Sequence, residues 1–205
     1  MNHLLNEEQF PAGFLPAWFE ARRRHALEQA EQLPEPSRHM ESWRFGAPGN
    51  ESLEHVEAAP PAAPETLAPI IRERASMPEA LRIVYANGLP VSIPEELPEG
   101  LSVMDMEDFV LQCPDTARKY LETETETLGS EKLSALATAF QHNGLVIMAD
   151  REISLPLEIL HFISGDNVAV FPSTLLIAET GSRLRILERH ISADHGRQFC
   201  GALQQ

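Results

Sequence analysis

The chain has 205 residues, 43% of them hydrophobic, which is enough to build one large domain or two small ones. Thirty-one acidic residues against sixteen basic ones give a net charge of −15. Nucleic-acid phosphates and an anionic membrane surface would both repel such a chain, so we expect neither as a partner.

Cysteine usage and the first residues indicate the compartment. Cys113 and Cys200 share no C-x-x-C spacing, so they suggest neither a disulfide framework nor a zinc motif. Residues 1–10 lack the basic and apolar regions of a signal peptide, and no apolar run reaches membrane-spanning length. We therefore expect a cytoplasmic protein with two reduced thiols.

The N-terminal part, residues 1–46, is expected to be mainly helical. Four apolar residues recur at intervals of four, four and three: Phe10, Phe14, Trp18 and Ala21. This spacing predicts an amphipathic helix over residues 6–32, whose regular part begins near Pro16 because proline fits the start of a helix. Its basic triplet, residues 22–24, is expected to face solvent.

Residues 33–46 follow this helix and contain two aromatic residues, Trp43 and Phe45, that would share one side of an extended stretch. Glu41 and Arg44 are placed to pair or to cap nearby groups. The pattern predicts a loop anchored by an aromatic side chain. Residues 47–69 carry five prolines and predict a linker.

Residues 70–144 predict a small α/β section. A strand over residues 81–86 runs into Asn87-Gly88, a pair that tolerates positive φ. Helices are expected over residues 106–112 with Asp105 as N-cap, over 115–122, and from Ser130 to the stop at residues 143–144. Residues 95–131 hold eleven acidic and two basic side chains, either a solvated face or a docking patch for a basic partner.

From residue 145 to 205 the pattern changes to short apolar runs separated by Gly, Pro, Asp or Asn. These runs cover residues 145–148, 159–163, 168–171, 175–178 and 184–187. Each has the length of a strand. Successive hairpins and the coils of a parallel β-helix both fit this spacing.

Few residues suggest chemistry. The chain lacks the glycine-rich nucleotide-binding motifs, G-x-S-x-G and H-E-x-x-H. Ligand types suited to zinc or iron cluster near the end: Glu188, His190, Asp194, His195 and Cys200. Glu188 and His190 alternate onto one strand face, but exposed polar residues at strand ends are the alternative interpretation. His161, between two apolar residues, is expected to be a satisfied, partly buried histidine, and no bound cofactor is expected.

Several segments resemble the SufB/SufD family of iron–sulfur cluster assembly proteins, and the SufD branch in particular. Residues 33–46 resemble the family's LP…(T/S)R…E-x-W-(R/K)-(Y/F) signature, which falls on Glu41, Trp43, Arg44 and Phe45. Residues 81–103 and 136–147 resemble later family passages, and residues 156–190 resemble the opening strands of its β-helix. Ser173 stands where the family often has arginine, and residues 137–139 lack its usual asparagine.

The resemblance implies an α+β fold in which the first coils of a right-handed parallel β-helix follow the helical and small α/β parts. It implies a non-catalytic scaffold subunit that acts with a SufB-like scaffold and a SufC-like ABC ATPase, with an iron–sulfur cluster only at the level of the complex. Because the family's cluster-building residues lie late in the β-helix, no site residue is carried over beyond the signature.

A β-helix that stops at residue 205 would leave an apolar end and unpaired strand edges. We expect either a longer gene product or self-association through this end. The alternative function is a β-helix carbohydrate-active enzyme, a lyase or an esterase, which would need acidic side chains beside Lys or Arg on adjacent coils. Residues 183, 185 and 189 are arginines on one strand face, with no evident acidic cluster opposite them.

Overall fold

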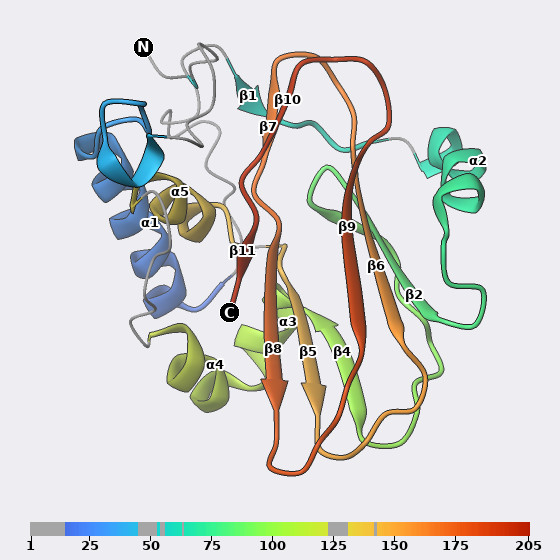
Figure 1. The fold of residues 1–205 in the computed structure, drawn as a ribbon. Helices are drawn as coiled ribbons and strands as arrows, with labels where there is room; N and C mark the ends of the chain where they lie inside the picture. Colours follow the sequence, from blue (N-terminus) through green and yellow to red (C-terminus); the bar gives the residue numbers. More distant parts are fainter. Residues whose placement is uncertain (1–14, 45–52, 54–55, 63, 123–130, 142) are drawn as a thin grey trace.

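The computed structural model describes residues 15–44, 53, 56–62, 64–122, 131–141 and 143–205 (Figure 1). These ranges contain five α-helices and three β-sheets, so the predicted α+β class is confirmed. Helices α1 (Ala17–Gln32), α4 (Pro114–Leu121) and α5 (Glu131–Ala139) lie on one side of the sheets in Figure 1, and α2 (Pro64–Arg74) lies on the opposite side.

Helix α1 starts where the sequence predicted. Pro16 is its N-cap, with φ −56° and ψ 140°, and the helix ends at Gln32 before the extended Leu33. The following Pro34 favours that extended backbone because its ring disfavours a helical residue before it. The predicted aromatic residues Phe10 and Phe14 lie outside the described residues.

Helices α1 and α5 pack together, and each supplies a buried cationic side chain that donates to carbonyl groups at the C-terminal end of the other. Arg23 Nε of α1 donates to the Ala139 carbonyl of α5 at 3.0 Å, and Lys132 Nζ of α5 donates to the Ala30 and Leu33 carbonyls at 2.7 and 2.9 Å. The last carbonyls of a helix have no intrahelical donor, so each cation supplies one that the backbone lacks.

The expectation that residues 22–24 face solvent is therefore wrong for two of the three. Arg23 is fully buried, and Arg22 Nη1 donates to Gln141 Oε1 at 2.7 Å. Burial lowers the pKa of Arg22 to about 10, against the opposing charge of Glu122. Arg24 is exposed. The helix pairing turns two of three consecutive positions inward, which a single-helix pattern does not indicate.

From residue 145 onward the strands visit three sheets in a fixed rotation. The first three are β5 (Leu145–Ala149), β6 (Leu157–Ile163) and β7 (Val168–Val170). The next four are β8 (Ser173–Ala178), β9 (Ile186–Ser192), β10 (Gln198–Cys200) and β11 (Leu203–Gln204). Strand β8 pairs in parallel with β5, β9 with β6, β10 with β7, and β11 with β8.

Paired residues in these strands are 29 or 30 positions apart. Leu145 pairs with Thr174, and Val168 pairs with Gln198. The turns between strands stack as well, because a Cβ on Gly196 would lie 2.0 Å from the Gly165 carbonyl oxygen. Each turn of chain therefore lies directly on the preceding one.

Three strands from earlier in the chain pair with the first members of this rotation, and a fourth pairs with one of those three. Strands β1 (Glu57–Ala58) and β2 (Leu81–Ala86) run parallel to β7 and β6. Strand β4 (Leu101–Asp105) runs antiparallel to β5, and β3 (Leu89–Ser92) is antiparallel to β2. The turn between β2 and β3 has φ 49° at Asn87 and 80° at Gly88, as predicted.

Residues 47–69 are not a structureless linker throughout, contrary to the prediction from composition. Strand β1 and the first part of α2 fall inside this range, and Val56 is only 3% exposed. Residues 57–58 form a strand because their backbone pairs with β7, which lies outside this segment of the sequence. Composition alone does not report such a neighbour.

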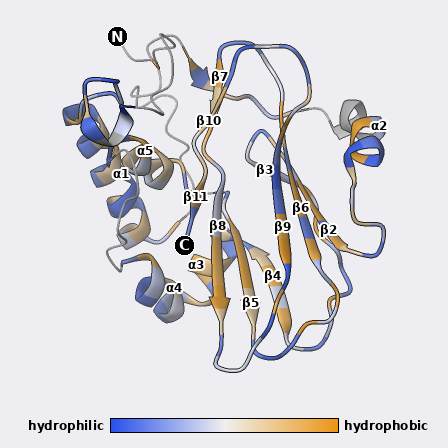
Figure 2. Ribbon diagram, in the orientation of Figure 1, coloured by the Kyte–Doolittle hydropathy of each residue, from blue (hydrophilic) through white to orange (hydrophobic). Residues whose placement is uncertain are grey.

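The sheets carry apolar side chains on both faces, and in Figure 2 hydrophobic residues run along the strands while the turns are hydrophilic. On the inner face, β5 and β6 share one core that includes Leu145, Ile147, Leu157 and Ile159. On the outer face, β5 and β8 pack against α1, α3 (Met106–Gln112) and α4. Helix α3 begins as predicted, since Asp105 accepts the Asp108 N–H at 2.7 Å.

Among the described residues, no helix combines the length and the apolar character that crossing a membrane requires.

Candidate functional site

The inner face of the stacked strands changes from apolar to polar within one turn of the chain. In β6 the inward positions include Leu157, Ile159 and His161, and their partners in β9 are Ile186, Glu188 and His190. The same change occurs where Val170 of β7 pairs with Cys200 of β10. We call six inward side chains the interior polar cluster: His161, Thr174, Glu188, His190, Cys200 and Gln204.

Glu188 is the centre of this cluster. Its Oε1 lies 2.8 Å from His161 Nε2 and accepts the Thr174 hydroxyl at 2.9 Å. Its Oε2 accepts the Gln204 amide at 2.6 Å. A carboxylate only accepts hydrogen bonds, so His161 carries a proton on Nε2. Four strands, β6, β8, β9 and β11, are thereby joined through one side chain.

His161 and His190 are stacked imidazoles, with ring centroids 4.8 Å apart and an interplanar angle of 10°. His190 Nε2 lies 3.9 Å from Glu188 Oε1, and His190 Nδ1 lies 3.6 Å from Cys200 Sγ. His161 Nδ1 is buried without a hydrogen-bond partner, as is the hydroxyl of Tyr85, which pairs with His161 across β2 and β6. The hydrogen bonding of the cluster is thus incomplete at His161 Nδ1, and that of its neighbour Tyr85 is incomplete at the hydroxyl.

Burial and neighbouring charges set the protonation of the cluster. Burial raises the pKa of the Cys200 thiol to about 11, and the negative charge of Glu188 adds to this. Burial, together with the neighbouring His161, lowers the pKa of His190 despite Glu188. Burial acts to raise the pKa of Glu188, but the hydrogen bonds from His161 and Thr174 and the electrostatic attraction of the two histidines outweigh it, so its pKa is lowered. Near neutral pH, Cys200 is a thiol and Glu188 a carboxylate.

The structure brings together three of the predicted ligand residues: Glu188, His190 and Cys200. The other two lie in the turn after β9, where Asp194 accepts the N–H groups of Gly165 and Gly196 and His195 is exposed. Among the described residues, no group of three or more His, Cys, Asp or Glu side chains is arranged to hold one metal ion.

His161 is a member of the cluster that the sequence analysis did not include. It was expected to be partly buried and satisfied, whereas it is 3% exposed and its Nδ1 has no partner. One signal was present, because His161 and His190 are 29 positions apart and that is the pairing distance of β6 and β9. The distance becomes informative only once this pairing is known.

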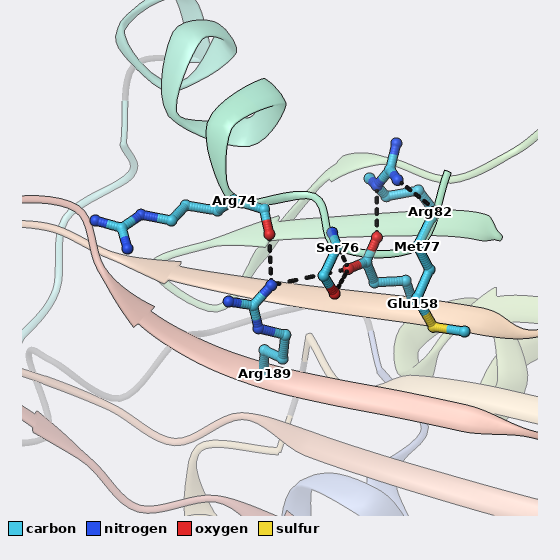
Figure 3. Close-up of polar contacts among 6 residues, drawn as sticks. All are labelled: Arg74, Ser76, Met77, Arg82, Glu158 and Arg189. Carbon is cyan, nitrogen blue, oxygen red and sulfur yellow. Dashed lines mark hydrogen bonds and ion pairs between the residues drawn. The ribbon is translucent and has the colours of Figure 1, made fainter. Parts of the chain in front are cut away.

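A second cluster lies on the outer face of the same sheet, around the fully buried carboxylate of Glu158 (Figure 3). Glu158 accepts the Ser76 N–H and hydroxyl at 2.8 and 2.7 Å, and Arg82 Nε at 2.9 Å. Arg189 Nη1 lies 3.8 Å from the carboxylate and donates to the Arg74 carbonyl. Figure 3 shows these groups closing over Glu158 from three sides.

This second cluster bears on the alternative function, because it places an acidic side chain beside arginines on adjacent strands. The carboxylate is completely covered, and its oxygens accept from Ser76 and Arg82. The sequence places two further arginines, Arg183 and Arg185, on the same strand face as Arg189. Arg183 lies 3.5 Å from the exposed Glu152, and Arg185 donates to the Ser154 carbonyl. The cluster holds the chain after α2 against the sheet, an arrangement that we call the Glu158 clamp. It leaves no carboxylate open to a substrate.

The family-like signature is a tight turn and not an extended stretch. Residues Glu41–Trp43 form a 3₁₀ helix, in which the Trp43 N–H donates to the Met40 carbonyl at 3.0 Å. The expected shared side of Trp43 and Phe45 is therefore not formed by an extended backbone, and Phe45 lies outside the described residues. The Trp43 indole N–H is buried without a hydrogen-bond partner.

Comparison with known proteins gives one match and one negative result. The chain is 25% identical, over 187 residues, to the iron–sulfur cluster assembly protein SufD of Bacillus subtilis (strain 168). The match covers 86% of this chain and 42% of that relative, so the chain spans less than half of the relative's length. No protein-family model matches the chain. The resemblance to SufD that the sequence motifs predicted is thus confirmed over most of the chain.

Proposed function

We propose that this chain is a non-catalytic scaffold subunit of a Suf-type iron–sulfur cluster assembly complex, within the SufB/SufD family. The observation that carries the proposal is the similarity to the iron–sulfur cluster assembly protein SufD across 86% of the chain. The motif matches are spread from the signature near residue 41 to the strands near residue 190 and so support one relationship over most of the chain.

The fold supports the same proposal. The three-sheet rotation with 29- or 30-residue pairing is what the successive coils of a parallel β-helix require. We infer that residues 145–205 are the first coils of a right-handed β-helix, preceded by the helical part (1–46), a proline-rich connection (47–69) and a small α/β section (70–144).

As partners we propose a SufB-like scaffold and a SufC-like ABC ATPase in the cytoplasm, with no nucleic acid and no membrane involved. The chain has no phosphate-binding loop motif, so ATP hydrolysis falls to the ATPase subunit. Iron and sulfide are the cargo of the complex. The open edges of β9, β10 and β11 are a further candidate surface for self-association.

Two features favour a scaffold over an enzyme. Cys200 is protonated near neutral pH, which makes it a poor nucleophile, and the Glu158 carboxylate is sealed. The carbohydrate-active enzyme would need an open acidic group beside a basic one, and the Glu158 cluster provides no such access.

The experiment is co-expression of the tagged chain, and of its longest reading frame, with the SufB-like and SufC-like proteins of the same organism. We expect the longer form to capture both partners. An unrelated tagged protein of similar negative charge controls for non-specific binding. Circular dichroism checks that both forms are folded. If neither folded form captures either partner, the proposal is overturned.

A further inference from the structure

We propose that the interior polar cluster is a pH-sensitive switch, in which protonation of both stacked imidazoles, His161 and His190, weakens the attachment of strands β9, β10 and β11 to β6, β7 and β8. We call β9, β10 and β11 the last strands. Two members of the cluster lie on β6 and β8 and the other four on the last strands, so the cluster joins the two sets. The inference goes beyond the proposed scaffold role and does not depend on it.

Two imidazoles share a single carboxylate in this cluster. The rings of His161 and His190 are stacked, with centroids 4.8 Å apart and an interplanar angle of 10°. Glu188 Oε1 lies 2.8 Å from His161 Nε2 and 3.9 Å from His190 Nε2. One negative charge balances one imidazolium. With both rings protonated, two positive charges would face each other across the β6–β9 pairing.

Burial makes this repulsion effective. The side chains of His161 and Glu188 are 4% and 10% exposed, and His190 is partly buried. Charges that are shielded from water interact more strongly than charges at the surface and are screened less by salt. Burial and the neighbouring His161 lower the pKa of His190 although Glu188 acts in the opposite direction. The closed cluster therefore resists the second proton.

The other titratable groups beside the two rings keep their charge state between pH 7.5 and 5.5. Burial and the charge of Glu188 raise the pKa of Cys200, on β10, to about 11. Burial and the charge of Asp105 raise the pKa of Tyr85, on β2. Glu188 itself has a lowered pKa and stays ionised. Imidazole is the side chain that ordinarily changes charge in this range, so the two rings are the groups that respond.

The opposite face of β6 and β9 carries the Glu158 clamp, which keeps its charges in the same range. The hydrogen bonds from Ser76 and Arg82 and the charge of Arg82 lower the pKa of Glu158 despite its burial. Arg189, on β9, remains a cation at any of these pH values. A change in β9 between pH 7.5 and 5.5 therefore originates in the interior polar cluster.

The last strands are placed to open without the rest of the molecule. Among the described strands, β9 is an edge of its sheet, and β10 and β11 each pair with one neighbour, β7 and β8. Strands with few neighbours open locally at a lower cost than enclosed strands do. Loss of the contacts of Glu188 and His190 removes interactions that hold β9 to β6 in addition to the backbone pairing.

The direction of the pH effect follows from the lowered pKa of His190. When the last strands open, the ring regains its ordinary pKa of about 6.5 and binds a proton more readily than in the closed state. The open state therefore gains stability as the pH falls below about 6.5, until the pH reaches the lower value of the closed state. We expect paired last strands at pH 7.5 and more frequent opening toward pH 5.5.

The test is native-state hydrogen exchange at pH 7.5 and 5.5, corrected for the intrinsic exchange rate of each amide at each pH. The protection of β9 should fall at least tenfold, while that of β5, inside its sheet, should stay within twofold. In His190→Gln, which cannot take up a proton at this position, the protection of β9 should change less than twofold. The matched control is His195→Gln, the exposed histidine of the next turn, which should behave as the unchanged protein does.

Equal protection of β9 at the two pH values in the unchanged protein would overturn the switch, and so would an equal fall in His190→Gln. A fall shared by β5 would also overturn it, because the whole fold would then be opening. Should His190→Gln fail to fold at pH 7.5, NMR titration of the unchanged protein decides. His190 should titrate at a lower pH than the exposed His25 and His195, together with the amide signals of β9. One common midpoint for the three histidines would count against the switch.

Discussion

Glu158 shows how a charged side chain can be stable with 0% exposure. Burial alone acts to raise its pKa, but the hydrogen bonds from Ser76 and the charge of Arg82 outweigh that effect, so the pKa is lowered from its usual value. Such a group stabilises the fold through its ionised form, which is fully populated above the pKa of the unfolded chain. That contribution disappears as the pH falls through the lower, folded-state value.

We therefore expect Glu158→Gln to destabilise the protein near neutral pH and to matter less in acid. The amide keeps the size of the side chain but leaves Arg82 without its charge partner, at a cost of about 2 kcal/mol. Urea unfolding over a series of pH values from 7 downward measures the difference, which should shrink as the pH falls through the lowered folded-state pKa of Glu158.

Glu152→Gln is the matched control, since Glu152 and its partner Arg183 are 65% and 77% exposed and lie 3.5 Å apart. An exposed pair of this kind contributes at most about 1 kcal/mol. Equal effects of the two substitutions at pH 7 would show that the Glu158 clamp is no stronger than a surface ion pair.

At the scale of elements, the α1–α5 pair depends on cations that each helix supplies to the other. Lys132 reaches the Ala30 and Leu33 carbonyls from the first turn of α5, and Arg23 reaches the Ala139 carbonyl at its last turn. The arrangement satisfies carbonyl groups that the helices would otherwise bury without donors. It also fixes the position of one helix along the other.

Lys132→Met should accordingly lower the free energy of unfolding by about 1–3 kcal/mol, because methionine fills the space but donates no hydrogen bond. Thermal and urea unfolding followed by circular dichroism check this result. Lys119→Met is the control, as Lys119 lies on the exposed part of α4 beside Tyr120. A loss at position 119 as large as that at 132 would contradict the capping role.

At the scale of the whole molecule, the parallel pairing makes β6 the most enclosed strand of its sheet. It lies between β2 and β9, and all seven of its residues are buried. Strands β3 and β9 are the edges of this sheet among the described strands, and their residues are half-buried or exposed.

Native-state hydrogen exchange should follow this order. Amides of β6 should exchange at least about tenfold more slowly than those of β3 and β9, a difference of about 1.4 kcal/mol in local opening. Exchange resolved by residue with NMR provides the measurement. Similar protection in all three strands would indicate that the sheet opens only as one unit.

Much of the local structure follows from the sequence because its signals act over a few residues. Pro16 and Asp105 mark helix starts, Asn87-Gly88 marks a turn with positive φ, and short apolar runs mark most strands after residue 145. Strands β1, β3, β4, β10 and β11 were not predicted, because they are two to five residues long and order by pairing with a neighbouring strand.

The sequence by itself determined the starts of α1 and α3, most of the strand segments after residue 145, the negative charge and the resemblance to SufD. Only the tertiary structure decided which of these residues meet. Local patterns set the backbone conformation and the alternation of side chains. Contacts between residues that are 29 or 30 positions apart in the sequence depend instead on the register between strands. That register joins His161, Glu188, His190 and Cys200, and helix pairing likewise buries Arg23 and Lys132, which composition alone would have placed in solvent.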